Sequence, residues 1–246
     1  MGILGRHYRT YALDFWGFGE SGKKRETYAV QDFVSLVNQF MEQLGIMHAP
    51  LVGHSMGGTV SLSVAIRYPE RVSKVVVVGS PIVGSSLAPL LKFAGYRTSA
   101  FVLFNMMGPF RAFMKHYYSH VICSDPRFPE MMDRDLSRTT LESFLLSIAS
   151  LRRTDLRPML DQIKVPAMGI YGDRDKVVHP KQWQPMQKGI PQALIERFPK
   201  AGHFPMLEEP QQFAEKLKFF LDQQNTPTPV PAVASPTPLP SVTLAP

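Results

Sequence analysis

The sequence predicts an α/β fold with a mostly parallel sheet, flanking helices and an inserted helical segment. Three observations in its 246 residues lead to this prediction. Short apolar strands alternate with amphipathic helices before residue 84 and again after residue 157. Four consecutive valines at 75–78 match a strand that is buried on both faces, as in a parallel sheet. Between residues 84 and 157 large apolar side chains are frequent, but no strand pattern occurs.

The first elements follow in the order strand, helix, strand, helix. A strand is expected over residues 8–14, followed by a glycine-containing loop. Residues 30–44 have apolar side chains at i, i+3, i+4 and i+7, which predicts an amphipathic helix that Gly45 ends. The apolar run 49–53 predicts a strand, and residues 59–68 predict a helix that stops before Pro69.

The later part of the chain continues the alternation of strands and helices, with three further strands and one further helix predicted. Strands are expected over residues 74–80, 165–172 and 194–198. A closing helix over residues 211–221 has one apolar face. Strands that alternate with helices in this way form a parallel sheet.

These patterns divide the chain into four parts. Residues 1–83 and 158–224 form the two halves of the core, and residues 84–157 form a helical cap rich in Phe and Met. Residues 225–246 are rich in proline and contain no charged residue, so we expect a disordered tail.

Composition narrows the classes of protein. The formal net charge is +7, but the sequence has no dense run of basic residues, which indicates a basic surface exposed to solvent. Weak contact with a membrane surface is the second interpretation of this charge. We expect no nucleic-acid partner. The single cysteine, Cys123, cannot form an internal disulfide, and no stretch reaches the roughly 18 apolar residues of a membrane span. We therefore expect a cytoplasmic protein; the oligomeric state is left open.

The segment Gly53-His54-Ser55-Met56-Gly57-Gly58 lies between a predicted strand and a predicted helix. This is the context of a nucleophile elbow, in which Ser55 occupies a strained turn and neighbouring glycines relieve steric clash. The backbone N–H of Met56 is then the donor to a developing oxyanion. His54 points away from the nucleophile in such a turn, and we assign it no catalytic role.

A serine nucleophile needs a base and an acid that orients the base. Asp173 and Asp175 both lie in the loop after the strand that ends at Gly172, where open α/β sheets place their sites. His203 follows the next strand and is the candidate base. Either aspartate can supply the acid on this reasoning.

Four blocks of the sequence resemble consecutive motifs of the α/β-hydrolase superfamily. They are Asp-Phe-Trp-Gly-Phe-Gly-Glu-Ser from residue 14, Gly-His-Ser-Met-Gly-Gly, Gly-Asp-Arg-Asp, and Gly-His-Phe-Pro-Met-Leu-Glu-Glu-Pro. The chain most resembles the capped, cofactor-free branch with carboxylesterases, monoacylglycerol-lipase-like enzymes, carbon–carbon bond hydrolases and haloperoxidase-like proteins. The resemblance implies a triad of Ser55, His203 and Asp175, because the acid is usually the fourth residue of a Gly-x-x-Asp block. It also implies that no cofactor or metal is needed.

The sequence departs from the family at its start. Family members have two or three strands before the one expected at residues 8–14. One of these lies between that strand and the strand at 49–53, and its His-Gly loop supplies a second oxyanion N–H. The sequence lacks this segment, so we expect an N-terminally truncated chain or a rearranged sheet, with low solubility or activity.

Three functions remain open. The first is a serine hydrolase that cleaves an ester or related acyl bond of a small apolar substrate, to which the Phe- and Met-rich cap contributes a pocket. The second is a non-catalytic, hydrolase-like binding protein. The third is a cofactor-free, haloperoxidase-like enzyme that uses the same triad.

Overall fold

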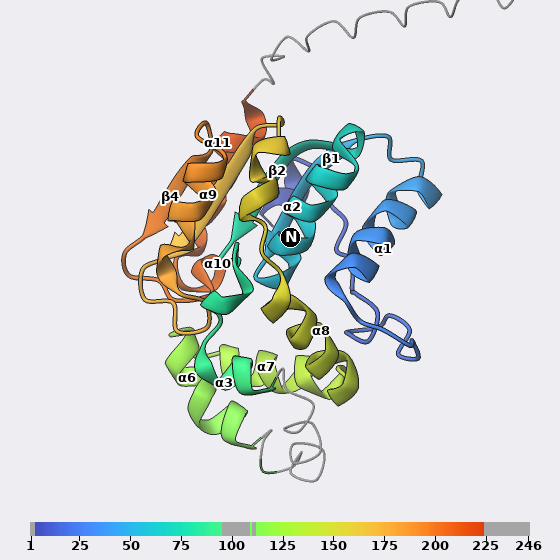
Figure 1. Ribbon diagram of the computed structural model, residues 1–246. Coiled ribbons are helices and arrows are strands. Elements are labelled where there is room, and N and C mark those ends of the chain that lie inside the picture. The colour runs from blue at the N-terminus through green and yellow to red at the C-terminus, as the bar shows by residue number, and fades with distance from the viewer. Residues whose placement is uncertain (1–2, 95–108, 110–111, 224–246) are drawn as a thin grey trace, which may run out of the picture.

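The computed structural model describes residues 3–94, 109 and 112–223 (Figure 1). The described residues form one four-stranded sheet in the order β1-β2-β3-β4, and every neighbouring pair is parallel. The strands are β1 (Ala49–His54), β2 (Val72–Val78), β3 (Ala167–Gly172) and β4 (Leu194–Phe198). The predicted α/β fold with a parallel sheet is therefore confirmed, with small differences in the strand bounds.

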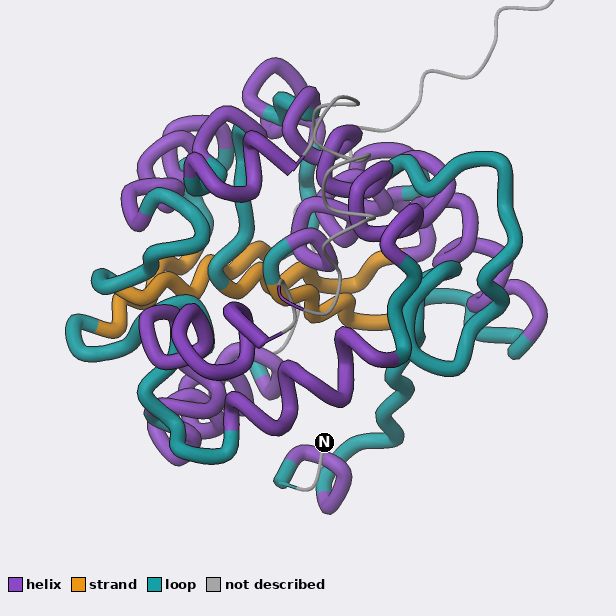
Figure 2. The backbone as a smooth tube through the Cα atoms, turned by 90° about the horizontal axis from the view of Figure 1, so that it is seen from below, coloured by secondary structure: helices purple, strands orange, loops and turns teal. Residues whose placement is uncertain are grey.

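Helices cover both faces of the sheet, which Figure 2 shows nearly edge-on. On one face α1, α2 and α9 pack with Val75 and Val77 of β2, and on the other α11 packs with Val76 and Val78. Because both faces are covered, all four valines are buried, which explains their run without alternation. The core helices are α1 (Val30–Gln43), α2 (Met56–Arg67), α9 (Trp183–Gly189), α10 (Pro205–Glu208) and α11 (Pro210–Asp222). Short 3-10 turns are η1 (Leu4–Arg6), η2 (Pro69–Arg71), η3 (Gly84–Ser86), η5 (Arg157–Gln162) and η6 (Pro180–Gln182).

Lys74 is the one charged residue of β2, whose other buried side chains are valines. It is only 5% exposed, and its ammonium donates hydrogen bonds to the backbone oxygens of Phe220, Leu221 and Gln223 at 3.0, 2.7 and 2.5 Å. These carbonyls lie at the C-terminal end of α11, where the helix provides no partners for them. Burial lowers the pKa of Lys74, and the nearby charge of Asp222 opposes this shift. Lys74 thus attaches the last helix to the sheet.

The strand predicted for residues 8–14 is wrong. A strand exists only where its backbone pairs with a neighbour, and within the described part of the chain residues 9–14 make no backbone-to-backbone hydrogen bond. The segment runs past one end of the sheet in Figure 2, and Tyr11 packs edge-on against Phe40 of α1, with ring centroids 5.9 Å apart. In the described sheet β1 is consequently an edge strand, and Val52 is 46% exposed.

The described part of the segment 84–157, called here the helical insertion, contains helices and no strand. It lies below the sheet in Figure 1. Its helices are α3 (Pro89–Ala94), the π-helical turn η4 (Met114–Tyr118), α6 (Ser119–Ile122), α7 (Phe128–Ser137) and α8 (Leu141–Arg153). The predicted tail at 225–246 lies outside the described residues. Of the helices in the described ranges, none has the length and apolar character needed to cross a bilayer.

Candidate active site

Ser55 occupies the sharp turn between β1 and α2. With φ 53° and ψ −122°, it is the one non-glycine residue in the described ranges with positive φ. Its backbone N–H donates to the carbonyl of Val78 at 2.8 Å, which attaches the turn to the end of β2. A side chain on Gly53 would place its Cβ 2.2 Å from the backbone oxygen of Gly57, and one on Gly58 would meet the Ser80 hydroxyl at 1.9 Å. Close approach therefore requires glycine at positions 53 and 58, whereas a side chain at Gly57 would meet no atom within 4 Å.

Asp175 and His203 form a buried pair at the same edge of the sheet. Asp175 lies in the loop after β3 and His203 in the loop after β4, and Oδ2 of the aspartate is 2.7 Å from Nδ1 of the histidine. The side chains of both residues are 3% exposed. The other carboxylate oxygen, Oδ1, accepts hydrogen bonds from the N–H groups of Val177 and Val178 at 2.7 and 2.9 Å. Because an ionised carboxylate only accepts, Nδ1 of His203 carries the proton and Nε2 is left as a base.

Asp173, the other candidate acid, points elsewhere. Its carboxylate pairs with the guanidinium of Arg197 at 2.8 and 3.0 Å near the surface. It makes no contact with His203 among the hydrogen bonds and ion pairs of the described residues. Sequence reasoning from the residues alone had left the two aspartates open.

The structure brings the elbow and the His203 loop to the same place. Gly79 directly follows β2, and a Cβ atom at this position would lie 3.2 Å from Nδ1 of His203. The residue before it, Val78, accepts the backbone hydrogen bond from the N–H of Ser55. Ser55 is half-buried, and the described hydrogen bonds include none between its hydroxyl and His203. The three predicted residues thus lie at the carboxyl ends of β1, β3 and β4 in one parallel sheet. Asp175 and His203 are hydrogen-bonded to each other, and the described hydrogen bonds include none from the hydroxyl of Ser55, the candidate nucleophile, to His203.

His54 has a role that sequence reasoning missed. Its Nε2 lies 2.9 Å from the backbone oxygen of His203, and its ring packs against those of His203 and Phe204 at 4.6 and 4.7 Å between centroids. Burial is the main cause that lowers the pKa of His54 to about 3, and the nearby His203 adds to the shift. A neutral His54 therefore donates from Nε2 to that carbonyl. The sequence shows only that His54 is adjacent to Ser55. The contact of its ring with the loop of His203 becomes visible only in the folded structure.

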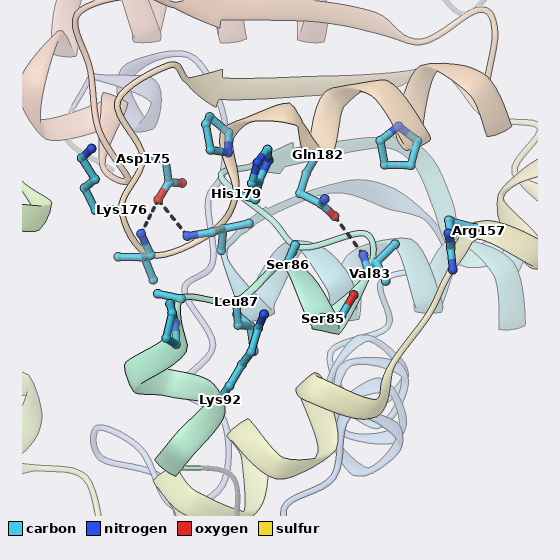
Figure 3. A pocket seen from close by; sticks show the side chains of 16 residues that line it. Val83, Ser85, Ser86, Leu87, Lys92, Arg157, Asp175, Lys176, His179 and Gln182 are labelled. Carbon is cyan, nitrogen blue, oxygen red and sulfur yellow. Dashed lines mark hydrogen bonds between the residues drawn. The ribbon is translucent and has the colours of Figure 1, made fainter.

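A pocket of about 680 Å³ opens beside the acid loop (Figure 3). It lies between residues 83–89, where the helical insertion begins, and residues 175–185. The amide oxygen of Gln182 accepts hydrogen bonds from the N–H groups of Ile82 and Val83 at 2.9 and 3.0 Å. Asp175 lines the pocket, but Ser55 and His203 do not, so this pocket is separate from the candidate nucleophile. Among the described residues no group of three or more His, Cys, Asp or Glu side chains is arranged to hold a metal ion.

Comparison with known proteins identifies the family of the fold. A family model of the alpha/beta hydrolase fold matches residues 3–210. An uncharacterised hydrolase, YugF of Bacillus subtilis, is 28% identical over 224 residues, which are 89% of this chain and 82% of the relative. A 2-hydroxy-6-oxononadienedioate/2-hydroxy-6-oxononatrienedioate hydrolase of Paraburkholderia phymatum is 29% identical over 227 residues, 88% of this chain and 77% of the relative.

Solved structures show the same fold. The crystal structure of a hydrolase from Pseudomonas aeruginosa superposes with a TM-score of 0.75 at 23% identity, over 90% of this chain and 83% of that one. A bromoperoxidase from Bacillus anthracis gives a TM-score of 0.73 at 23% identity, over 85% and 80%. With the family model spanning most of its length, the chain belongs to the alpha/beta hydrolase fold family.

Proposed function

We propose that this protein is a serine hydrolase that cleaves an ester or related acyl bond of an apolar substrate. The observation that carries the proposal is the buried Asp175–His203 hydrogen bond of 2.7 Å, at the sheet edge where Ser55 occupies its strained turn. Strain of this kind persists where the surrounding structure enforces it, and it collects at functional sites. An oriented imidazole and a serine hydroxyl are the two parts that nucleophilic acyl transfer needs.

In the proposed reaction the Ser55 hydroxyl attacks the carbonyl carbon of the substrate while Nε2 of His203 takes its proton. The oxygen of the resulting tetrahedral species accepts a hydrogen bond from the backbone N–H of Met56, the first residue of α2, where helix N–H groups have no partner within the helix. Asp175 stabilises the imidazolium. His203 then protonates the departing alcohol, which leaves an acyl group on Ser55. Water, deprotonated by His203, releases the acid and restores the serine.

The apolar character of the substrate is inferred from the helical insertion, which we propose to act as a cap. Phe128 of α7 packs against Phe204, beside the base, with ring centroids 4.5 Å apart. In the same insertion, burial is the main cause that raises the pKa of Tyr118 in η4, and the negative charge of Asp175 adds to the rise. The contact of Phe128 with the residue after His203, in a segment whose sequence is rich in Phe and Met, favours an apolar acyl or alcohol portion of the substrate.

A labelling experiment tests the proposal. Ser55→Ala should abolish covalent labelling by a fluorophosphonate probe and hydrolysis of p-nitrophenyl esters, because only an activated hydroxyl attacks such centres. The matched control is Ser85→Ala, which removes an exposed hydroxyl in the pocket beside the acid loop and should leave both signals unchanged. Labelling that survives in Ser55→Ala would refute the nucleophile assignment.

The same preparation tests the alternatives. A relative 29% identical is named as a hydrolase of 2-hydroxy-6-oxononadienedioate, so this compound is assayed beside short and long esters. Bromide oxidation in the presence of peroxide and a carboxylic acid tests the haloperoxidase-like alternative. A folded protein that neither turns over these substrates nor reacts with the probe would support the non-catalytic binding alternative.

A further inference from the structure

Glu208 ends the short helix α10, which begins two residues after His203. One carboxylate oxygen, Oε2, accepts a hydrogen bond from the backbone N–H of Gly202 at 2.7 Å. The other, Oε1, accepts from the backbone N–H of Ser124 at 3.0 Å and from its hydroxyl at 2.9 Å. The two oxygens therefore bind different parts of the molecule, the loop of the candidate base and the helical insertion.

This arrangement ties the two parts closely. A carboxylate only accepts hydrogen bonds, and bonds to a charged acceptor are shorter and stronger than neutral ones. Glu208 forms no ion pair among the described residues, so these three donors are its partners there. If the insertion side withdrew, Oε1 would lose both of its donors and the side chain would no longer be fixed against Gly202.

Gly202 provides an independent indication that the insertion meets this loop. A Cβ at this position would lie 3.0 Å from the backbone oxygen of Ile122 and 3.4 Å from Oε2 of Glu208. The backbone of the insertion therefore approaches the residue before the base so closely that a larger side chain at Gly202 would fit only if its neighbours shifted by a few tenths of an ångström. The insertion contacts the loop from the other end as well, through Phe128 and Phe204.

We propose that Glu208 is a positioning residue that couples the docking of the helical insertion to the placement of His203. The inference rests on the proposed hydrolase function, in which His203 is the base. Glu208 touches neither His203 Nε2 nor Ser55 in the described contacts, so it acts through the backbone of Gly202. When the insertion is docked, Ser124 binds Oε1 of Glu208. The other oxygen of Glu208 then binds the backbone of Gly202 and fixes the loop that contains His203.

The test uses the full chain and the variants Glu208→Gln, Ser124→Ala and the double variant. The amide of Gln has one acceptor oxygen for three donors, so it cannot serve both sides at once. Glu209→Gln is the matched control: it removes the same charge from the next residue, whose Oε1 has no hydrogen-bond partner in the described structure. The readouts are kcat and KM for a p-nitrophenyl ester, the thermal midpoint, and hydrogen exchange of peptides that cover residues 119–124 and 199–204.

We expect Glu208→Gln to lower kcat roughly ten- to hundred-fold with KM nearly unchanged, because small displacements of catalytic groups cost rates of this order. Exchange should rise in both peptides while the thermal midpoint stays near that of Glu209→Gln. Ser124→Ala should lower kcat by a few-fold in the wild-type background and have no further effect beside Glu208→Gln, because the two residues share one contact.

Two results would overturn the inference in a protein whose wild type is labelled at Ser55. One is a Glu208→Gln variant that keeps wild-type kcat, and the other is additivity of the Ser124 and Glu208 effects. If the Glu208→Gln variant fails to fold, Ser124→Ala decides the question. Unchanged kcat and unchanged hydrogen exchange at residues 199–204 in Ser124→Ala would refute the coupling. Absence of labelling in the wild type would instead reject the proposed function itself.

Discussion

Replacing Asp175 by Asn removes the negative charge and one hydrogen-bond acceptor of the side chain while keeping its size and shape. Asn has nearly the same volume, but one of its two polar atoms is a donor. Oδ1 of Asp175 accepts two backbone N–H groups, and Oδ2 faces a single nitrogen of His203. Turning the amide NH2 toward the two N–H groups would leave both without an acceptor, at about 1 to 3 kcal/mol each. The Asn oxygen therefore keeps Val177 and Val178, and the NH2 faces His203.

This orientation determines the size of the effect. An NH2 group facing Nδ1 forces that nitrogen to accept, so the proton of the neutral ring moves to Nε2, which can then no longer act as the base toward Ser55. A wrong tautomer of this kind costs about 10⁴ in kcat where it has been isolated, or roughly 5.5 kcal/mol of transition-state stabilisation. We expect a loss of that order in kcat for a p-nitrophenyl ester.

Asp173→Asn is the matched control, two positions earlier in the same loop. Its carboxylate pairs with Arg197, whose side chain is 51% exposed, and surface pairs contribute about 0 to 1 kcal/mol. We expect kcat within about two-fold of wild type. An Asp175→Asn variant with kcat within ten-fold of wild type, or a larger loss in Asp173→Asn, would refute the assignment of the acid.

Three further predictions concern stability and the elbow. The pKa of His54 is about 3 in the folded protein against an ordinary 6.5, so only the unfolded chain binds a proton between these values. The free energy of unfolding should fall as pH falls from about 6.5, by up to roughly 1.4 kcal/mol per unit. Urea titrations of His54→Gln should show a shallower fall, and equal slopes would contradict the prediction. Lys74→Met should lower the free energy of unfolding by about 2 kcal/mol or more, since carbonyls of α11 lose their donor; an unchanged urea midpoint would contradict this. Gly58→Ala should abolish probe labelling because its Cβ would meet the Ser80 hydroxyl at 1.9 Å, and full labelling would show that the turn can relax.

Several features followed from the sequence because local chemistry fixes them. Four adjacent valines can only be buried together where both faces of a strand are covered, and the structure covers both faces of β2. Glycines around Ser55 indicated a turn that side chains would obstruct, and the distances at Gly53 and Gly58 give the reason. The order of strands and helices was likewise sufficient for the parallel sheet.

Other features depend on residues far apart in the chain, which no local pattern specifies. Residues 8–14 have the composition of a strand, but strand formation requires a neighbour to supply the ladder, and the described structure supplies none. Lys74 begins the strand that the sequence predicts, but the sequence does not show that its charged side chain is buried. Its partners at the C-terminus of α11 lie 146 residues later in the chain, and they make its burial favourable. The choice between Asp173 and Asp175 depended on a family pattern until the loop placed one against His203 and the other against Arg197. Sequence determines which side chains are available at the ends of the strands, whereas hydrogen-bond partners are decided by which backbone groups the tertiary fold brings within 3 Å.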